Sequence, residues 1–204
     1  MGSRLEGGYA CVGGSFPRDK LDGDMPRLFV GIGMPVEVSE RLTALREPVE
    51  EVRWVGAEKM HLTLRFIGEV DEHRIESLAV GLDGIDVARF EMRVEGVGVF
   101  PSRRRPRVLW AGVAADEELW SLQTRVEETL RLLGVKAEEN PFHPHVTLAR
   151  LKRVDPHWAR SFLHRHHRFI GGVFSVPSFH LYQSRLSKSG ARYEKMATFS
   201  LSKG

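Results

Sequence analysis

Two short segments of the sequence carry the same pattern of reactive side chains. His61 is followed two residues later by Thr63, and His145 is followed two residues later by Thr147. In an extended strand, residues two apart share a face and lie about 6.5–7 Å apart along the backbone, so each segment presents an imidazole beside a hydroxyl. Two such pairs in one cleft suit a phosphodiester. One imidazole can take a proton from water, the other can protonate the leaving oxygen, and the hydroxyls can donate hydrogen bonds to the phosphate.

The residues around each pair predict strands. Residues 60–67 alternate between apolar and polar side chains, which places Phe66 in the core and Arg65 on the face of His61. Arg65 is therefore a weaker candidate for holding a phosphate. Residues 142–151 also read as a strand, in which Arg150 could bind the phosphate. Strict alternation puts Arg150 on the face opposite His145 unless a bulge intervenes, so both alternatives remain open for it.

Each of these strands follows another strand and a helix. Residues 27–32 form a continuous apolar strand, and a helix with apolar positions 38, 42, 45, 49 and 52 follows from about residue 36, kinked or ended locally at Pro48. Residues 108–113 and a helix over 116–133, ending at Gly134, repeat this order before the second strand. The order is a weak internal duplication and indicates two similar lobes whose equivalent strands meet at the centre.

Further strands are predicted over 90–100, 174–182 and 193–201, and helices from about Asp71, its N-cap, and from Asp155-Pro156. The glycine-rich stretch 1–25 predicts a flexible leader, which leaves residues 26–204 as a single domain.

Composition restricts the class of protein. The chain of 204 residues has a formal net charge of +3 and one cysteine, which excludes an intrachain disulfide and a site built from several thiolates. No segment is apolar enough for a signal peptide or a bilayer span. We therefore expect a cytoplasmic monomer with no membrane partner. The cluster His164 to His167 matches no zinc spacing, and we expect neither a metal nor a cofactor.

Basic residues concentrate in two places. The turn Arg103-Arg104-Arg105 and the stretch 152–168 could form a rim that binds the backbone of RNA. A solvated surface is the alternative for both.

The sequence resembles the two-histidine (2H) phosphoesterase superfamily, and within it the RNA 2',3'-cyclic phosphodiesterase family, also named 2'-5' RNA ligase. The resemblance runs from about residue 26 to the C-terminus. It rests on the segments Arg27-Leu28-Phe29-Val30-Gly31-Ile32, Arg53-Trp54-Val55, His61 to Val70 (HLTLRFIGEV), Gly96 to Pro101, Pro106 to Trp110, Pro144 to Arg150 (PHVTLAR) and Tyr182-Gln183-Ser184-Arg185-Leu186 with Gly190 and Tyr193.

The resemblance implies an α/β fold of the α+β type, bilobal and pseudo-twofold, with two antiparallel-rich sheets around a central cleft and helices outside. It also implies hydrolysis of RNA 2',3'-cyclic phosphate ends to 2'-phosphate ends. His61 takes the family's role of proton donor and His145 that of proton acceptor, and Thr63 and Thr147 bind the phosphate. The ligase name reflects a reverse reaction that joins tRNA halves through a 2'-5' linkage, which makes tRNA fragments one candidate substrate. The sequence departs from relatives at His143, which shares the face of His145 by alternation.

Three alternatives remain open from the sequence. The same site could act on 2'-5'-linked oligonucleotides or on small nucleotide cyclic phosphates. The chain could instead bind RNA ends without catalysis, through its basic rim. A metalloenzyme is the weakest of the three.

Overall fold

The centre of the molecule is a sheet in which every strand runs antiparallel to its neighbours. The computed structural model describes residues 25–114, 116–187 and 190–203, so nearly all of the expected leader lies outside the described residues. The described residues form nine strands: β1 (Arg27–Gly33), β2 (Val52–Trp54), β3 (His61–Glu69), β4 (Phe90–Phe100), β5 (Val108–Val113), β6 (His145–Leu151), β7 (Ile170–Val176), β8 (Ser178–Ser187) and β9 (Gly190–Ser200). Their order is β7-β4-β5-β6-β3-β1-β8-β9, and β2 pairs with β6.

The midpoint of this order lies between β6 and β3, with four strands on either side. On one side lie β3, β1, β8 and β9, and on the other lie β6, β5, β4 and β7. The two central strands pair at a single position, Leu62 opposite Val146, and both side chains are completely buried. The mixed α/β fold with an antiparallel sheet is confirmed. The two expected sheets join at this one pair into a single nine-stranded sheet.

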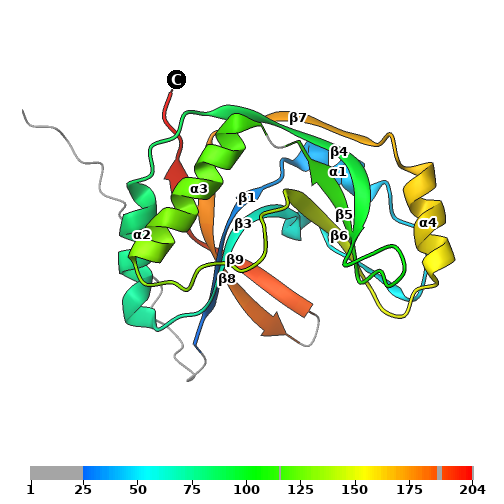
Figure 1. Cartoon of the computed structure of the whole chain (residues 1–204), viewed down its shortest axis with the longest axis horizontal. Helices are drawn as coiled ribbons and strands as arrows, with labels where there is room; N and C mark the ends of the chain where they lie inside the picture. Colours follow the sequence, from blue (N-terminus) through cyan, green and yellow to red (C-terminus); the bar gives the residue numbers. More distant parts are fainter. Residues whose placement is uncertain (1–24, 115, 188–189, 204) are drawn as a thin grey trace, which may run out of the picture.

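The described residues also form four α-helices: α1 (Val36–Thr43), α2 (Ile75–Asp83), α3 (Glu117–Leu132) and α4 (Pro156–Arg165). Figure 1 shows α2 and α3 at one end of the molecule and α4 at the other. The expected helix over 116–133 is confirmed, and Gly134, with a φ of 77°, ends it in the left-handed conformation that glycine tolerates. Asp155 caps α4 as expected, because its carboxylate accepts a hydrogen bond of 2.7 Å from the backbone N–H of His157.

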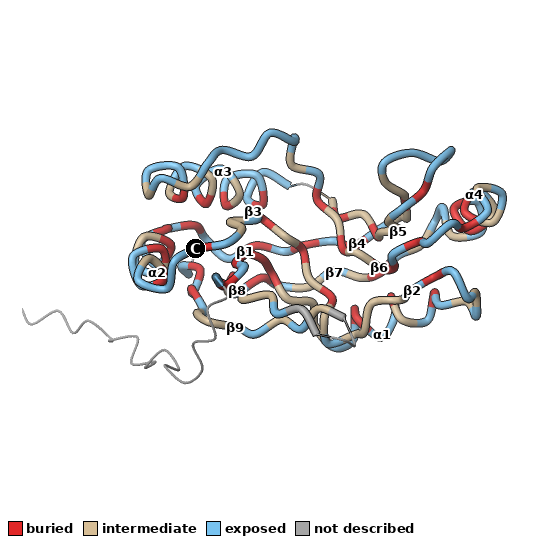
Figure 2. Tube along the Cα trace, turned by 90° about the horizontal axis from the view of Figure 1, so that it is seen from below, coloured by how far each residue is buried: buried red, intermediate tan, exposed pale blue. Residues whose placement is uncertain are grey.

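The helices tie the two sides of the sheet together. Helix α3, which follows β5 in the chain, packs against β3 on the other side, and α1, which follows β1, packs against β7. Figure 2 shows the buried residues gathered along the strands and on the inner sides of α2 and α3. Each half of the sheet is therefore covered in part by a helix that follows a strand of the other half.

Three boundaries differ from the prediction. Helix α1 ends at Thr43, before Pro48, and positions 49 and 52 lie outside it. Proline disfavours helical geometry in the residue before it, and the chain from Leu42 to Arg46 already tightens into turn hydrogen bonds. The strand expected over 174–182 is two strands, divided at Pro177, which has no N–H to donate. Asp71 makes no side-chain cap and precedes a short 3₁₀ turn over residues 72–74.

A β-bulge interrupts the alternation in both central strands at the same place. On β3, Thr63 pairs with Gly31 and Arg65 with Val30, which leaves Leu64 without a partner on β1. The expectation for residues 65 and 66 is therefore wrong. Arg65 is only 6% exposed and Phe66 is 60% exposed, because the extra residue of the bulge reverses the two faces beyond it.

The bulge on β6 is the counterpart of the one on β3. Thr147 pairs with Trp110 and Ala149 with Leu109, which leaves Leu148 as the extra residue. Leu148 and Ala149 are both completely buried, and Arg150 is exposed. Of the two alternatives left open for Arg150, the structure selects the bulge, which returns this arginine to the face of His145.

Candidate active site

The motif residues of the two strands meet on one face of the sheet. His61 and Thr63 flank Leu62 on β3, as His145 and Thr147 flank Val146 on β6, and the two central residues pair with each other. Alternation turns all four polar side chains away from the buried pair. All four are half-buried. The structure thus brings the four residues expected from the sequence onto a common surface.

Both imidazoles are anchored in the same way. Nδ1 of His61 lies 2.7 Å from the carbonyl oxygen of Lys59, and Nδ1 of His145 lies 2.7 Å from the carbonyl oxygen of His143. A carbonyl oxygen can only accept, so each Nδ1 carries the proton and donates it. The neutral form of each ring then has its lone pair on Nε2. Each Nε2 can accept a proton as a base, or donate one after the ring has been protonated.

The environment lowers the pKa of both histidines. For His61 the main cause is burial, which disfavours the charged imidazolium; the hydrogen bond to Lys59 opposes this, and repulsion from His145 adds to it. For His145 burial is again the main cause, and the hydrogen bond to the carbonyl of His143 opposes it, whereas the charge of the His143 ring adds to it. Protonation of His145 therefore disfavours protonation of His61.

Aromatic rings surround His61. The ring centroid of Phe29 on β1 lies 4.7 Å from that of the imidazole, and Tyr193 on β9 meets it edge-on at 5.0 Å. Tyr182 on β8 stacks on Phe29 at 5.0 Å. Burial raises the pKa of Tyr182 to about 12, which keeps its hydroxyl protonated at neutral pH. These three rings lie in segments that carry the family resemblance, but no role for them is predicted from the sequence, because their contact with His61 depends on strand order.

The surroundings of His145 are different. Phe100, the last residue of β4, meets its ring edge-on at 5.0 Å, and the ring centroid of His143 lies 6.2 Å away. The indole of Trp110 on β5 packs against His143 at 4.9 Å and lies across Gly98, where a Cβ would overlap the ring. His143 is exposed beside these rings. A second imidazole therefore stands beside His145, whereas the equivalent position two residues before His61 is Lys59.

The positions beyond the two bulges also differ. Phe66 and Arg150 occupy equivalent places and both are exposed on the face that carries the histidines. Phe66 lies next to Phe29, with ring centroids 6.0 Å apart, so it extends the aromatic surface from His61. Arg150 lies directly opposite Arg53 of β2, in a strand pair where opposite side chains share a face. One side of the site is apolar and the other is cationic.

Arg65 takes no part in this surface. Its guanidinium donates to the carboxylate of Glu127 on α3 and to the carbonyl oxygens of Phe66 and Lys136, and it lies 3.5 Å from the carboxylate of Glu138. Each of the three guanidinium nitrogens thereby donates a hydrogen bond inside the protein. The weaker expectation that Arg65 holds a phosphate is overturned, since the bulge at Leu64 directs it to α3.

The chain is similar to proteins that are already known. The family model described as LigT like Phosphoesterase matches residues 32–110 and 112–193. A protein of Aeropyrum pernix named RNA 2',3'-cyclic phosphodiesterase is 37% identical over 163 residues, covering 76% of this chain and 92% of its own length. A protein of Archaeoglobus fulgidus with the same name is 32% identical over 176 residues, covering 85% of this chain and 99% of its own length.

Solved structures resemble the fold described above. The crystal structure of TT0787 of Thermus thermophilus has a TM-score of 0.74 at 30% identity and covers 86% of this chain and 97% of its own. The crystal structure of E. coli LigT complexed with 3'-AMP has a TM-score of 0.73 at 27% identity and covers 88% and 100%. In the described part of this chain, no helix is long and apolar enough to cross a membrane.

Proposed function

Since the chain belongs to the LigT-like phosphoesterase family, we propose that this enzyme hydrolyses 2',3'-cyclic phosphate ends of RNA to 2'-phosphate ends. The relatives at 32% and 37% identity are named RNA 2',3'-cyclic phosphodiesterase, and this chain aligns with nearly their whole length. The proposal assigns the reaction to residues 26–204 as one unit, because strands from both ends of this range surround His61.

The reaction needs one neutral and one protonated imidazole. His145, with a free lone pair on Nε2, takes a proton from water as the water oxygen attacks phosphorus. The bond from phosphorus to O3' breaks, and Nε2 of protonated His61 gives its proton to that oxygen. The products are a free 3'-hydroxyl and a 2'-phosphate. Each ring keeps the orientation for this exchange through the hydrogen bond from its Nδ1 to a backbone carbonyl.

Other groups on the same face would bind the substrate. The hydroxyls of Thr63 and Thr147 donate to the non-bridging oxygens of the phosphate, where negative charge accumulates in the transition state. Arg150 supplies a positive charge on the side of His145. On the side of His61, the exposed ring of Phe66 offers a surface on which the terminal base can stack.

The observation that carries the proposal is the matched anchoring of the two imidazoles across the pair formed by Leu62 and Val146. Two histidines that were merely structural would not need the same tautomer, the same face and a shared contact between their strands. Together these three features present two Nε2 atoms on one face, where an acid and a base can act on the same phosphate.

The test is an incubation of the purified protein, in excess chelator, with a short RNA that ends in a 2',3'-cyclic phosphate. We expect a 2'-phosphate product, identified by its resistance to a 3'-phosphatase, and we expect the product to be lost in both His61→Ala and His145→Ala. Turnover at the wild-type rate by a folded double variant would overturn the proposal.

The same preparation separates the alternatives. Faster turnover of 2'-5'-linked oligonucleotides or of nucleoside 2',3'-cyclic phosphates would move the assignment to those substrates. Tight, salt-sensitive RNA binding with no product after long incubation would leave an RNA-end binder. Incubating tRNA halves with the enzyme and looking for a 2'-5' junction tests the reverse ligation.

A further inference from the structure

A basic surface continues from the His145 side of the site to the far end of the molecule. Strand β4 ends at Phe100, whose ring meets His145 at 5.0 Å, and the chain then enters the turn of residues 101–107 that leads into β5. This turn carries Arg103, Arg104 and Arg105, all exposed. Only a Pro-Ser dipeptide therefore separates Phe100 from the arginine triplet.

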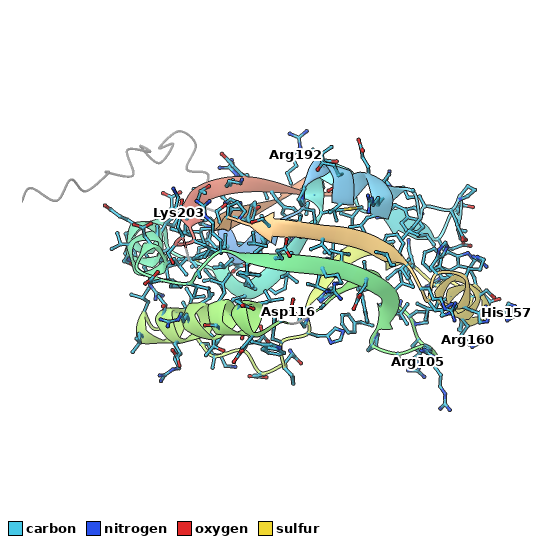
Figure 3. All side chains as sticks on the ribbon, turned by 90° about the horizontal axis from the view of Figure 1, so that it is seen from above. Arg105, Asp116, His157, Arg160, Arg192 and Lys203 are labelled. Atoms are coloured by element: carbon cyan, nitrogen blue, oxygen red, sulfur yellow. The ribbon has the colours of Figure 1, made fainter. Side chains whose placement is uncertain are left out.

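The turn faces helix α4. A hollow of about 760 Å³ lies between Arg103 and this helix, and none of its eight lining residues is acidic. Six of the eight are arginines or histidines: Arg103, His157, Arg160, His164, Arg165 and His167. Figure 3 shows Arg105, His157 and Arg160 together at this end of the molecule, on the turn and on α4.

The charges of this surface are largely unpaired. Among the described residues, no carboxylate lies within 4.0 Å of the basic groups of Arg53, Arg103, Arg105, Arg150 or Arg160. Of the six basic residues in the hollow, Arg165 alone has a carboxylate partner in the described chain, Glu47 at 2.6 Å. Excess positive charge of this kind is complementary to a polyanion.

A second, independent observation is a pair of arginines on the two neighbouring strands β2 and β6. Arg150 on β6 and Arg53 on β2 are direct cross-strand partners, both exposed on the same face. Like charges directly opposite each other destabilise a strand pair. An anion bound between the two guanidinium groups removes that repulsion, and a phosphodiester is such an anion.

We propose that the RNA strand on the 5' side of the reacting phosphate leaves the site past Arg150 and Arg53 and continues over the Arg103–Arg105 turn into the hollow beside α4. This inference rests on the proposed function and adds a direction to it. The terminal base lies on the aromatic side, at Phe66, and the rest of the strand lies on the cationic side. The substrate is then an oligonucleotide whose backbone phosphates contribute to binding, rather than a mononucleotide.

The experiment compares two substrates and two charge-matched variants. The substrates are an RNA decanucleotide with a 2',3'-cyclic phosphate end and the corresponding nucleoside 2',3'-cyclic phosphate. The test variant R103Q/R105Q/R160Q removes three exposed charges from the basic surface. The control variant R125Q/R131Q/K203Q removes three exposed charges from α3 and the C-terminal segment.

We expect the test variant to lose about tenfold or more in kcat/KM on the decanucleotide and to keep wild-type activity on the mononucleotide. Its slope of log kcat/KM against log salt should be smaller by about 2, since each lost contact to a single strand contributes about 0.7. The control variant should match the wild type on both substrates. An equal change on both substrates, or no change on the decanucleotide, would overturn the proposed path.

The result also separates this inference from the proposed function. Binding of the decanucleotide, measured by fluorescence anisotropy with a non-hydrolysable end, tests the path even if neither substrate is turned over. Weaker binding by the test variant alone supports the path whatever reaction the site performs. Binding by the test variant as tight as that of the wild type overturns it, including when the cyclic phosphate is hydrolysed normally.

Discussion

The half-site around His61 and the half-site around His145 share a backbone and differ in their surroundings. Each has a histidine whose Nδ1 lies 2.7 Å from a carbonyl two residues earlier, a threonine two residues later and a bulge at the following leucine. Around His61 the neighbours are the aromatic rings of Phe29 and Tyr193, whereas His145 has one aromatic ring, Phe100, and a second imidazole, His143, as neighbours.

The difference gives the two copies of the motif distinct environments. The repeated backbone anchors the two imidazoles in the same way, and the proposed function assigns the proton-donor role to His61 and the acceptor role to His145. Beyond the bulges the same division continues, with Phe66 on one side and Arg150 on the other. A symmetric framework therefore presents an asymmetric surface, and the proposed substrate is also asymmetric, with a base at one end and a phosphate chain at the other.

The largest expected effect separates the two histidines by their roles. We expect His61→Ala and His145→Ala each to lower kcat on an RNA cyclic phosphate by about 10²–10⁴-fold. A nitrophenyl phosphodiester has a leaving oxygen that needs no proton, so His61→Ala should recover most of its activity on that substrate and His145→Ala should not. Equal losses for the two variants on the aryl ester would contradict the division into donor and acceptor.

The next effect concerns stability at a position where the two halves differ. Arg65 is buried among acceptors, whereas the equivalent position on β6 is Ala149. We expect Arg65→Ala to lower the free energy of unfolding by about 2–3 kcal/mol. This is less than the ~3–5 kcal/mol of a fully buried pair, because Glu127 and Glu138 are partly exposed. Urea unfolding measures the change. Arg150→Ala, an exposed control, should stay within about 0.5 kcal/mol of the wild type.

A smaller effect tests the contrast beyond the bulges. We expect Phe66→Ala to weaken inhibition by the nucleoside 2'-phosphate product by about 1–2 kcal/mol at every salt concentration, because it removes one stacking surface. Arg150→Ala should weaken it most at low salt, since screening reduces its contribution. Inorganic phosphate is the control inhibitor and should be insensitive to Phe66→Ala. The same salt dependence for both variants would remove the distinction between an apolar and a cationic side.

The smallest effect concerns the coupling between the imidazoles. Because the pKa of His61 is lowered, chiefly by burial, its proton is lost at a lower pH than that of free histidine. The pH profile of kcat/KM should therefore fall on its alkaline side with a midpoint below 6.5.

In an NMR titration His145→Gln should raise the pKa of His61, and His143→Gln should raise the pKa of His145 while leaving that of His61 unchanged. No response of His61 to His145→Gln would show that the two rings titrate independently.

The sequence predicts the local pattern of this site better than its surroundings. The motif strands, the long helix α3 and the meeting of the two repeats follow from periodicity, duplication and resemblance. The faces of the sheet on which Phe66 and Arg65 lie do not follow from the sequence. The bulge arises from the pairing of β3 with β1, and it leaves the residue pattern of β3 unchanged.

Contacts between residues far apart in the sequence are also not predicted from it. The aromatic rings around His61 come from β1 and β9, and the basic hollow joins a hairpin turn to α4. The order of strands in a sheet decides which distant residues become neighbours, and hydrophobic periodicity contains no information on that order. The sequence suggests that the two basic stretches could form one rim, whereas the hollow between Arg103 and α4 is known only from the structure.

The strand order also dictates when the site can be completed as the chain is synthesised. Strand β1 emerges before both motif strands, yet one of its two partners is β8, and the Tyr193 ring beside His61 belongs to β9, which follows β8. A nascent chain that already contains both histidines therefore leaves one edge of β1 unpaired. Since domains fold as units and long-range pairing is slow, the half-site around His61 forms only after β8 and β9 have left the ribosome. A nascent chain without β8 and β9 therefore exposes one edge of β1 and lacks the Tyr193 ring beside His61.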